Sequence, residues 1–267
     1  MVDWLSPATI AMQSQIFMRF MHALLGLYLW EWAISLDFDW LFISGKRKFR
    51  WPLIFYFANR YLLLGAMIGI AIALDSFTEI DCQSIYTFNQ LSGQAAVGLA
   101  SINLSLRTIA VWGNNKIVIG GLVLLILGHW SLILQGVLLK AQWSPELSTC
   151  LITETNNTIL AATFIYSMVF DLIVLLLNVW KLGFARTGAA GVSMKSGSNL
   201  AHLIFKDGLI YFFIAFLGNV IATVFMVLNL NPIMSVIFNV PSAIASTIVA
   251  TRVVRRLTNY GTNGPEV

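Results

Sequence analysis

The sequence predicts an all-α integral membrane protein, a polytopic transmembrane bundle of seven helices with its N-terminus outside and its C-terminus in the cytosol. Of its 267 residues, 58% are hydrophobic and 10% are charged, whereas a soluble domain has about 45–50% apolar and about 25% charged residues. The apolar residues also fall into runs near the ~20 residues that cross a ~30 Å hydrocarbon core. Finally, Lys and Arg gather in the loops of one side, as they do in cytosolic loops.

The first three spans are expected at residues 16–36, 53–74 and 88–112. Trp51-Pro52 precedes the second span. The turn sequence Gly113-Asn114-Asn115 ends the third, because glycine and asparagine mark chain reversals. These boundaries are uncertain by about two to four residues.

The fourth and fifth spans are expected at residues 117–139 and 158–180. The cytosolic segment that follows, residues 183–198, is rich in Gly and Ser, a composition typical of flexible linkers. The other loops are short, so the bundle is nearly the whole chain. One transmembrane domain is therefore expected over residues 1–257, followed by a short cytosolic tail at 258–267.

The last apolar stretch, residues 209–254, is too long for a single crossing. Asn229-Leu230-Asn231-Pro232 divides it, because proline cannot continue the hydrogen bonding of a helix. This division predicts a sixth span at residues 209–228 and a seventh at 233–251.

The distribution of basic residues sets the orientation. With the N-terminus outside, thirteen Lys and Arg residues lie in cytosolic loops and the tail, and Lys140 is the basic residue of the outer loops. A wrong number of spans would scramble this bias. Topology and attraction to anionic lipids therefore explain the net charge of +4. We expect the lipid bilayer as partner, in the plasma membrane or another secretory-pathway membrane, and no nucleic acid. The thirteen are Lys46, Arg47, Lys48, Arg50, Arg107, Lys116, Lys181, Arg186, Lys195, Lys206, Arg252, Arg255 and Arg256.

The two cysteines of the chain, Cys82 and Cys150, both fall in outer loops of this topology. Outer loops face an oxidising compartment, where disulfides form and persist. We therefore expect a bond that pins the long outer loop to the start of the third span; two unrelated free thiols are the alternative. On the same side, Asn156-Asn157-Thr158 matches the glycosylation sequon, which makes Asn156 a candidate for modification although it abuts the fifth span.

Polar residues inside the spans are costly in hydrocarbon, so each is a candidate for function. Counting ~1.5 Å of rise per residue, five of them from five spans lie at one depth, roughly 14–18 Å from the cytosolic end. They either hydrogen bond between helices, at about 0.6 kcal/mol per contact, or line a buried site whose formal charge is Asp171. This midplane layer consists of Asn103, His129, Asp171, Asn219 and Asn239.

A second polar layer lies nearer the cytosol. Glu31 on the first span and Arg60 on the second lie roughly 8–11 Å from their inner ends. Each alone would be an expensive isolated charge, so we expect the two to form an ion pair. Arg107, near the inner end of the third span, either competes for Glu31 or extends its side chain to the lipid phosphates.

The sequence does not support an enzyme. A retinal pigment needs a lysine within a span, and residues 233–251 contain none. A metal site needs several ligands at one level, but His22, His129 and His202 fall at outer, middle and cytosolic depths. We find no nucleotide-binding loop and no Ser-His-Asp arrangement, so we expect no catalytic residues, metal or cofactor.

Several segments resemble a family of uncharacterised fungal membrane proteins of seven helices, best populated in basidiomycetes. The resemblance rests on GLYLWEWAISLDFDW at residues 26–40, GKRKFRWP at 45–52, Asn59-Arg60-Tyr61, and PSAIASTIVATRVVRR at 241–256. The likeness spans most of the chain, although none of the motifs is chemically specific. The family implies a seven-helix fold and no established activity.

The architecture is also similar to that of G-protein-coupled receptors, with an outer disulfide to the third span and an arginine at its inner end. The sequence departs from the receptor motifs, however. Ser105-Leu106 precedes Arg107 in place of an acidic residue, and Asn231-Pro232 lies at the outer end of the last span. Since a shared architecture does not determine function, this similarity is an analogy.

Three functions follow as hypotheses. The first is a receptor-like signalling protein with a small-molecule or lipid ligand. The second is a transporter or channel that uses the midplane layer. The third is a structural or lipid-organising homo-oligomer, for which Gly65 and Gly69 provide the small-xxx-small spacing of helix contacts.

Overall fold

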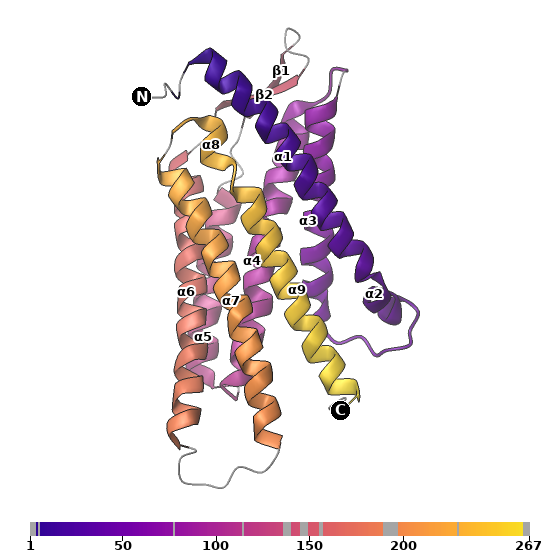
Figure 1. Ribbon diagram of the computed structural model, residues 1–267, viewed down its shortest axis with the longest axis vertical. Helices are drawn as coiled ribbons and strands as arrows, with labels where there is room; N and C mark the ends of the chain where they lie inside the picture. The colour runs from indigo at the N-terminus through magenta and orange to yellow at the C-terminus, as the bar shows by residue number, and fades with distance from the viewer. Residues whose placement is uncertain are drawn as a thin grey trace.

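The protein is described here by a computed structural model that covers residues 4, 6–76, 78–113, 115–135, 140–144, 149–154, 157–188, 197–228 and 230–263. Long helices pack side by side into an elongated bundle, with a small hairpin at one end (Figure 1). In chain order the elements are α1 (Pro7–Ile34), α2 (Leu36–Ile43), α3 (Leu53–Asp75), α4 (Cys82–Val111), α5 (Lys116–Gln135), β1 (Lys140–Ser144), β2 (Thr149–Glu154), α6 (Asn157–Gly188), α7 (Gly197–Leu228), α8 (Pro232–Val236) and α9 (Asn239–Asn263).

Within this part of the chain, six segments are long and apolar enough to cross a membrane. They are α3, α4, α5, the 158–181 part of α6, the 209–228 part of α7, and residues 233–259 of α8 and α9. This is compatible with an integral multi-span membrane protein. The remaining long helix, α1, is not among them, because polar residues such as Arg19, His22 and Glu31 interrupt its apolar sequence.

The two ends of the bundle differ chemically, and we name them by their content. The hairpin end holds β1, β2 and the start of α1, and the arginine end holds the last turns of α9 with Arg252, Arg255 and Arg256 (Figure 1). Helix α1 runs from one to the other, since Gln13 accepts a hydrogen bond from Asn231, just before α8, and Glu31 binds Arg252.

The predicted first span, residues 16–36, is broken in the structure. Helix α1 ends at Ile34, and the Ser35 hydroxyl donates to the Glu31 carbonyl at 2.7 Å. The chain then turns into α2, which buries Phe38 and Phe42 against the start of α3. This short helix was not expected from the sequence, because its apolar residues continue the preceding run.

The hairpin end carries a second element that the sequence did not predict. Strands β1 and β2 pair antiparallel, with Trp143 opposite Cys150. Cys150 forms a disulfide with Cys82, their Cα atoms 5.6 Å apart, so the hairpin is joined to the first turn of α4. Asp81 caps this turn by accepting from the Ser84 hydroxyl at 2.6 Å, and this bond, with one from the Ser84 amide, lowers the pKa of Asp81.

Several predicted boundaries shift. The predicted seventh span, residues 233–251, is divided into α8 and α9, and α9 continues to Asn263 through the first part of the predicted tail. Helices α6 and α7 extend into the predicted loop at 183–198, of which residues 189–196 lie outside the described part. The last four residues of the predicted fourth span, 136–139, also lie outside it.

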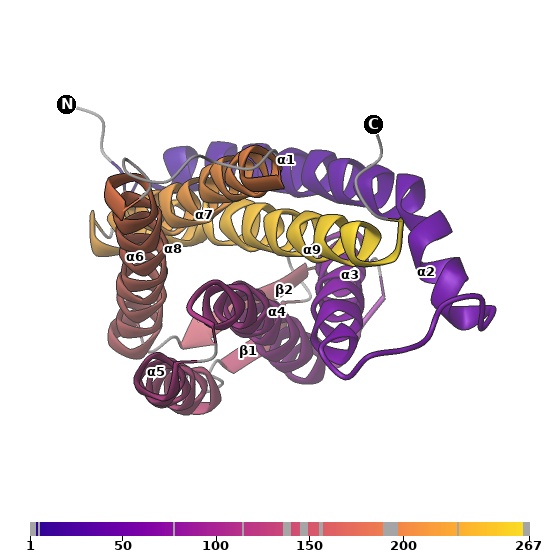
Figure 2. The ribbon, with the colours of Figure 1, turned by 90° about the horizontal axis from the view of Figure 1, so that it is seen from below.

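Helix α4 lies at the centre of the bundle, between α3, α5, α6 and α9 (Figure 2). In the most apolar stretch of α4, 67% of the residues are buried, whereas in that of α5, which faces outward, 17% are buried. Small residues let the neighbours approach closely, and those buried on α4 include Ser92, Ala95, Ala96, Gly98, Ala100, Ser101 and Ser105. One core cluster fills the space between α1, α3, α4 and α9, and another the space between α4, α5, α6, α7 and α9.

Candidate functional site

The midplane layer contains a buried chain of polar side chains that joins three helices. The Asp171 carboxylate on α6 accepts a hydrogen bond of 2.6 Å from the Asn219 amide on α7. The same amide group approaches the Ser167 hydroxyl at 3.3 Å, and the Asn219 carbonyl accepts from Ser242 on α9 at 2.7 Å. The structure therefore brings together two of the five predicted residues, Asp171 and Asn219, and adds two serines.

The other three members of the layer are not part of this chain. His129 on α5 stacks on Tyr166, with ring centroids 5.8 Å apart. Within the described part of the structure, His129 Nε2, both side-chain polar atoms of Asn103 and Asn239 Oδ1 are buried without a hydrogen-bond partner. The described contacts therefore connect Asp171 and Asn219 with each other, and His129 with Tyr166.

The predicted ion pair between Glu31 and Arg60 is wrong. Glu31 binds two arginines of α9 instead, with 2.6 Å to Arg252 Nη2 and 2.8 Å to Arg255 Nη2. The two helices run in the same direction, so the depth of Glu31 in α1 matches that of these residues near the end of α9. Counting residues placed Glu31 at the right level but could not tell which helix it faces.

Arg60 finds its counter-charge in α2. Its Nε lies 3.2 Å from Asp39 Oδ2, and both side chains are almost fully buried, at 4% and 1% exposure. The Arg60 guanidinium also donates to the Ser35 hydroxyl and the Trp32 carbonyl. Tyr56 donates to the other Asp39 oxygen at 2.9 Å. The unpredicted break at Ser35 is what folds Asp39 back onto α3, and it explains why the sequence indicated the wrong pair.

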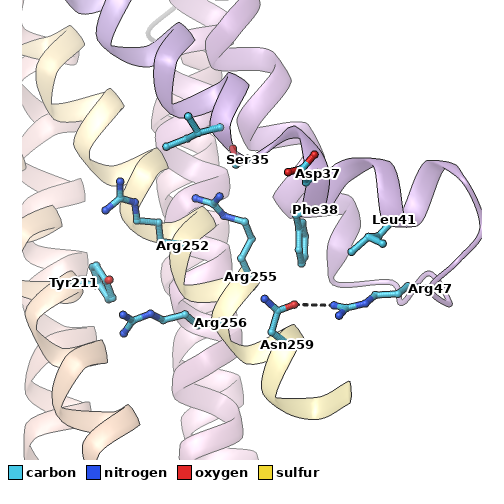
Figure 3. A pocket seen from close by; sticks show the side chains of 11 residues that line it. Ser35, Asp37, Phe38, Leu41, Arg47, Tyr211, Arg252, Arg255, Arg256 and Asn259 are labelled. Carbon is cyan, nitrogen blue, oxygen red and sulfur yellow. Dashed lines mark hydrogen bonds between the residues drawn. The ribbon is translucent and has the colours of Figure 1, made fainter. Parts of the chain in front are cut away.

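The arginine end contains a pocket of about 510 Å³, which we call the arginine pocket (Figure 3). One wall comes from the end of α1 and from α2, the opposite wall from α9, and α7 contributes Tyr211. The lining residues are Ile34, Ser35, Asp37, Phe38, Leu41, Arg47, Tyr211, Arg252, Arg255, Arg256 and Asn259.

Hydrogen bonds and ring contacts hold the arginines of this pocket in place. Glu31, which does not line the pocket, accepts hydrogen bonds from Arg252 and Arg255 and so fixes their orientation. Arg47, in the segment between α2 and α3, donates to the side-chain oxygen Oδ1 of Asn259 at 2.7 Å, and Figure 3 shows this bond. The Arg256 guanidinium lies over the ring of Tyr211, 5.5 Å from its centroid.

This arrangement is suited to binding an anion. The guanidinium group presents a planar fork of donors that matches carboxylate and phosphate oxygens. Arg255 and Arg256 lie three and four residues after Arg252, so each of them is a neighbour of Arg252 on the surface of α9. The sequence contained this signal, but we interpreted it only as evidence for orientation.

Arg107, the predicted inner arginine of the third span, does not line the arginine pocket. It is 7% exposed, and its guanidinium lies over the ring of Phe212 on α7, 5.6 Å from the centroid. Glu31 is therefore bound by the α9 arginines and not by Arg107. The candidate glycosylation residue Asn156 lies outside the described residues.

No protein-family model matches the chain, and no curated protein matches it closely enough to be a relative. The resemblance to a fungal seven-helix family therefore stays a prediction. Within the described residues, no group of three or more His, Cys, Asp or Glu side chains is placed to hold a metal ion. The convergence of four arginines makes the arginine pocket the candidate functional site.

Proposed function

We propose that the protein is a receptor-like membrane protein of seven spans that binds an anionic ligand in the arginine pocket from the cytosolic side. One observation carries this proposal: four arginines from two distant segments converge on one pocket. Guanidinium groups that lie close together repel one another, and an anion between them offsets this repulsion. Glu31, which does not line the pocket, pairs with Arg252 and Arg255, and an anionic ligand would add contacts to the guanidinium groups that face the pocket.

The path of α1 supports a seventh span. Gln13 meets Asn231 at the hairpin end, and Glu31 meets Arg252 and Arg255 at the arginine end. A helix that accompanies the apolar 233–259 segment over this length lies in the same bilayer. The positive-inside rule then favours an arginine end in the cytosol and a disulfide-bonded hairpin outside.

The receptor-like role follows from what a ligand in this pocket would touch. It would contact the α1–α2 break, Tyr211 on α7 and the arginines of α9 at once. The same two helices, α7 and α9, are joined at mid-depth by the hydrogen bond between Asn219 and Ser242. A ligand shifts a conformational equilibrium by the difference between its binding free energies for the two states. A ligand that bridges α7 and α9 therefore favours the state in which these helices lie close together.

Binding is tested with pyrophosphate as a soluble anionic probe, titrated into the full chain in neutral detergent and followed by calorimetry. Arg47→Gln should weaken binding about tenfold, because it removes a charge-assisted contact. Arg50→Gln is the matched control, since Arg50 is exposed in the same segment and does not line the pocket. Absence of saturable binding to the wild type, or equal losses in the two variants, would overturn the proposal.

The receptor-like part has its own measurement. Spin labels on exposed positions of α7 and α9 report the distance between these helices in the presence and absence of pyrophosphate. We expect a narrower distance distribution with the anion and no change in the Arg47→Gln protein. An unchanged distribution in a protein that binds the anion would leave a binding site without receptor-like coupling.

A transporter is the second candidate, favoured by the chain from Asp171 through Asn219 to Ser242 and by the buried, unpartnered Asn103 at similar depth. A buried carboxylate in a bilayer is typical of ion and proton pathways. Proteoliposomes loaded with a pH-sensitive dye test it. Proton flux that is lost in Asp171→Asn supports a transporter, and equal flux in liposomes with and without protein excludes proton transport.

A further inference from the structure

The segment that joins α2 to α3, residues 44–52, forms part of the surface of the arginine end. It lies beside α3 and away from α5 and α6 (Figure 2). The Arg47 amide donates to the Leu41 carbonyl at 3.0 Å, and the Gly45 amide donates to the Phe42 carbonyl at 3.2 Å. Gly45 has a φ of 70°, which glycine adopts without strain. These bonds give the chain a defined turn before it enters α3.

Two aromatic rings of this segment lie against the first turns of α3. The Phe49 ring stacks on Phe57, with centroids 6.2 Å apart. The Trp51 ring meets Phe55 edge-on, with centroids 5.9 Å apart. Both rings remain largely exposed, Phe49 at 54% and Trp51 at 62%. Each is therefore held by α3 on one side and open on the other.

Basic side chains accompany these rings along the chain. Lys46, Lys48 and Arg50 are all exposed, and the last two alternate with Phe49 and Trp51. Exposed aromatic rings are costly in water, whereas a surface that combines such rings with Lys and Arg is typical of segments that lie in the membrane interface. In that position the rings reach the edge of the acyl chains and the cations reach the phosphates.

The place of the segment in the bundle agrees with such a position. It directly precedes Leu53, the first residue of α3, and α3 is apolar enough to cross a membrane. Tryptophan prefers the level of the headgroups, and lysine extends its charged end from there toward phosphate and water. At the end of α2, Trp40 and Ile43 are 62% and 67% exposed and add to the apolar part of this surface.

We propose that residues 40–51, which we call the interfacial segment, bind anionic phospholipids of the adjacent leaflet. The exposed rings insert among the headgroups, and the three exposed cations pair with phosphate and carboxylate oxygens. The inference goes beyond the proposed function, because these exposed side chains do not line the arginine pocket. It shares with that proposal the topology, in which this leaflet faces the cytosol and is rich in anionic lipid.

The test uses the full chain with Ser44→Cys, an exposed position whose replacement leaves the rings and cations of the interfacial segment intact. Cys82 and Cys150 are joined to each other, so the new thiol alone takes a nitrobenzoxadiazole label. The protein is placed in nanodiscs of phosphatidylcholine with an equal fraction of nitroxide-labelled phosphatidylserine or nitroxide-labelled phosphatidylcholine. Quenching by each labelled lipid reports its local concentration, and the emission wavelength reports how deeply the fluorophore is immersed.

We expect stronger quenching by phosphatidylserine than by phosphatidylcholine. Lys48→Gln should lower the relative association of phosphatidylserine about fivefold, the effect of one basic residue near a membrane surface. Raised salt should reduce the preference as well, because it screens exposed charges. Lys181→Gln is the matched control and should change nothing, since Lys181 is an exposed lysine of α6, on the other side of the bundle (Figure 1).

A second pair of variants tests the rings. Trp51→Ser should shift the emission to longer wavelength and reduce its intensity, because the segment loses a side chain that holds it at the headgroup level. Trp180→Ser is the matched control and should change neither, since Trp180 is 60% exposed and lies on α6. All four substituted side chains are exposed, so the variants should keep the fold.

The possible results separate the parts of the inference. Equal quenching by the two lipids overturns the preference for anionic headgroups. An emission spectrum that is unchanged in Trp51→Ser overturns the insertion of the rings. Effects of Lys181→Gln or Trp180→Ser as large as those of Lys48→Gln or Trp51→Ser overturn the assignment to this segment. The proposed function keeps its own test, because pyrophosphate binding to the same proteins is measured separately.

Discussion

The pair formed by Asp39 and Arg60 permits a sharp test of how the buried charges stabilise the fold. Both side chains are almost fully buried, and the guanidinium Nε lies 3.2 Å from the carboxylate. Asp39→Asn keeps the shape of the side chain and removes its charge. Arg60 keeps its donors to Ser35 and to the Trp32 carbonyl but loses its counter-charge.

The expected cost follows from this geometry. Removing one partner of a buried ion pair costs about 3–5 kcal/mol, because it leaves an uncompensated charge. Arg60 keeps its other hydrogen bonds, and the amide oxygen introduced at position 39 can still accept one, so Asp39→Asn should lie at the lower end, about 3 kcal/mol. The exposed pair of His22 and Asp75, 2.7 Å apart and 39% and 54% exposed, is the control. There Asp75→Asn should cost less than about 1 kcal/mol.

The assay is reversible unfolding of the full chain in mixed micelles, driven by sodium dodecyl sulfate and followed by circular dichroism. A double-mutant cycle with Asp39→Asn and Arg60→Gln should give a coupling energy of about 2–3 kcal/mol. The cycle between Glu31→Gln and Arg60→Gln should give a coupling near zero. A larger coupling for Glu31 than for Asp39, or a cost of Asp39→Asn no greater than that of Asp75→Asn, would refute the reasoning.

Three further sets of substitutions test the packing and the crosslink by the same unfolding assay. Asn219→Ala should destabilise the bundle by about 1–3 kcal/mol, because it leaves a carboxylate and a hydroxyl buried without their partner. Gly128→Ala should cost about 1–3 kcal/mol, since its methyl group would clash with the phenol of the facing helix α6; Gly26→Ala, with open space around it, should be neutral or slightly stabilising. Cys150→Ser should cost about 2–4 kcal/mol, and adding Cys82→Ser should cost nothing more. An Asn219→Ala protein of wild-type stability, equal effects of the two glycine changes, or additive cysteine losses would contradict these expectations.

The positions of the helices could largely be predicted from the sequence. Residues 53–74 and 209–228 were expected as spans and lie in α3 and α7, because a crossing needs an uninterrupted apolar run of fixed length. The breaks within apolar runs escaped prediction. At Ser35 no proline or glycine marks the turn, and the hydroxyl that accompanies it binds a carbonyl of its own helix.

The site was harder to predict than the fold. Asp171 and Asn219 were placed at one depth, and they do meet, because depth follows from counting residues along a straight helix. Glu31 and Arg60 were also at one depth, yet each binds another residue. Equal depth in the bundle is not enough for two side chains to meet. Their contact also depends on how each helix is rotated about its axis and on which helices lie next to it.

By itself, the sequence determined that this chain is helical, that its helices are apolar enough for a membrane, and that its basic residues gather at one end. Those properties depend on the composition and on the order of residues along the chain, so they can be inferred without knowing which residues are in contact. The tertiary structure alone decided which charges pair and that four arginines surround a pocket with one apolar wall. Such convergence depends on how helices tilt and rotate against one another, and packing between residues far apart in the sequence sets both.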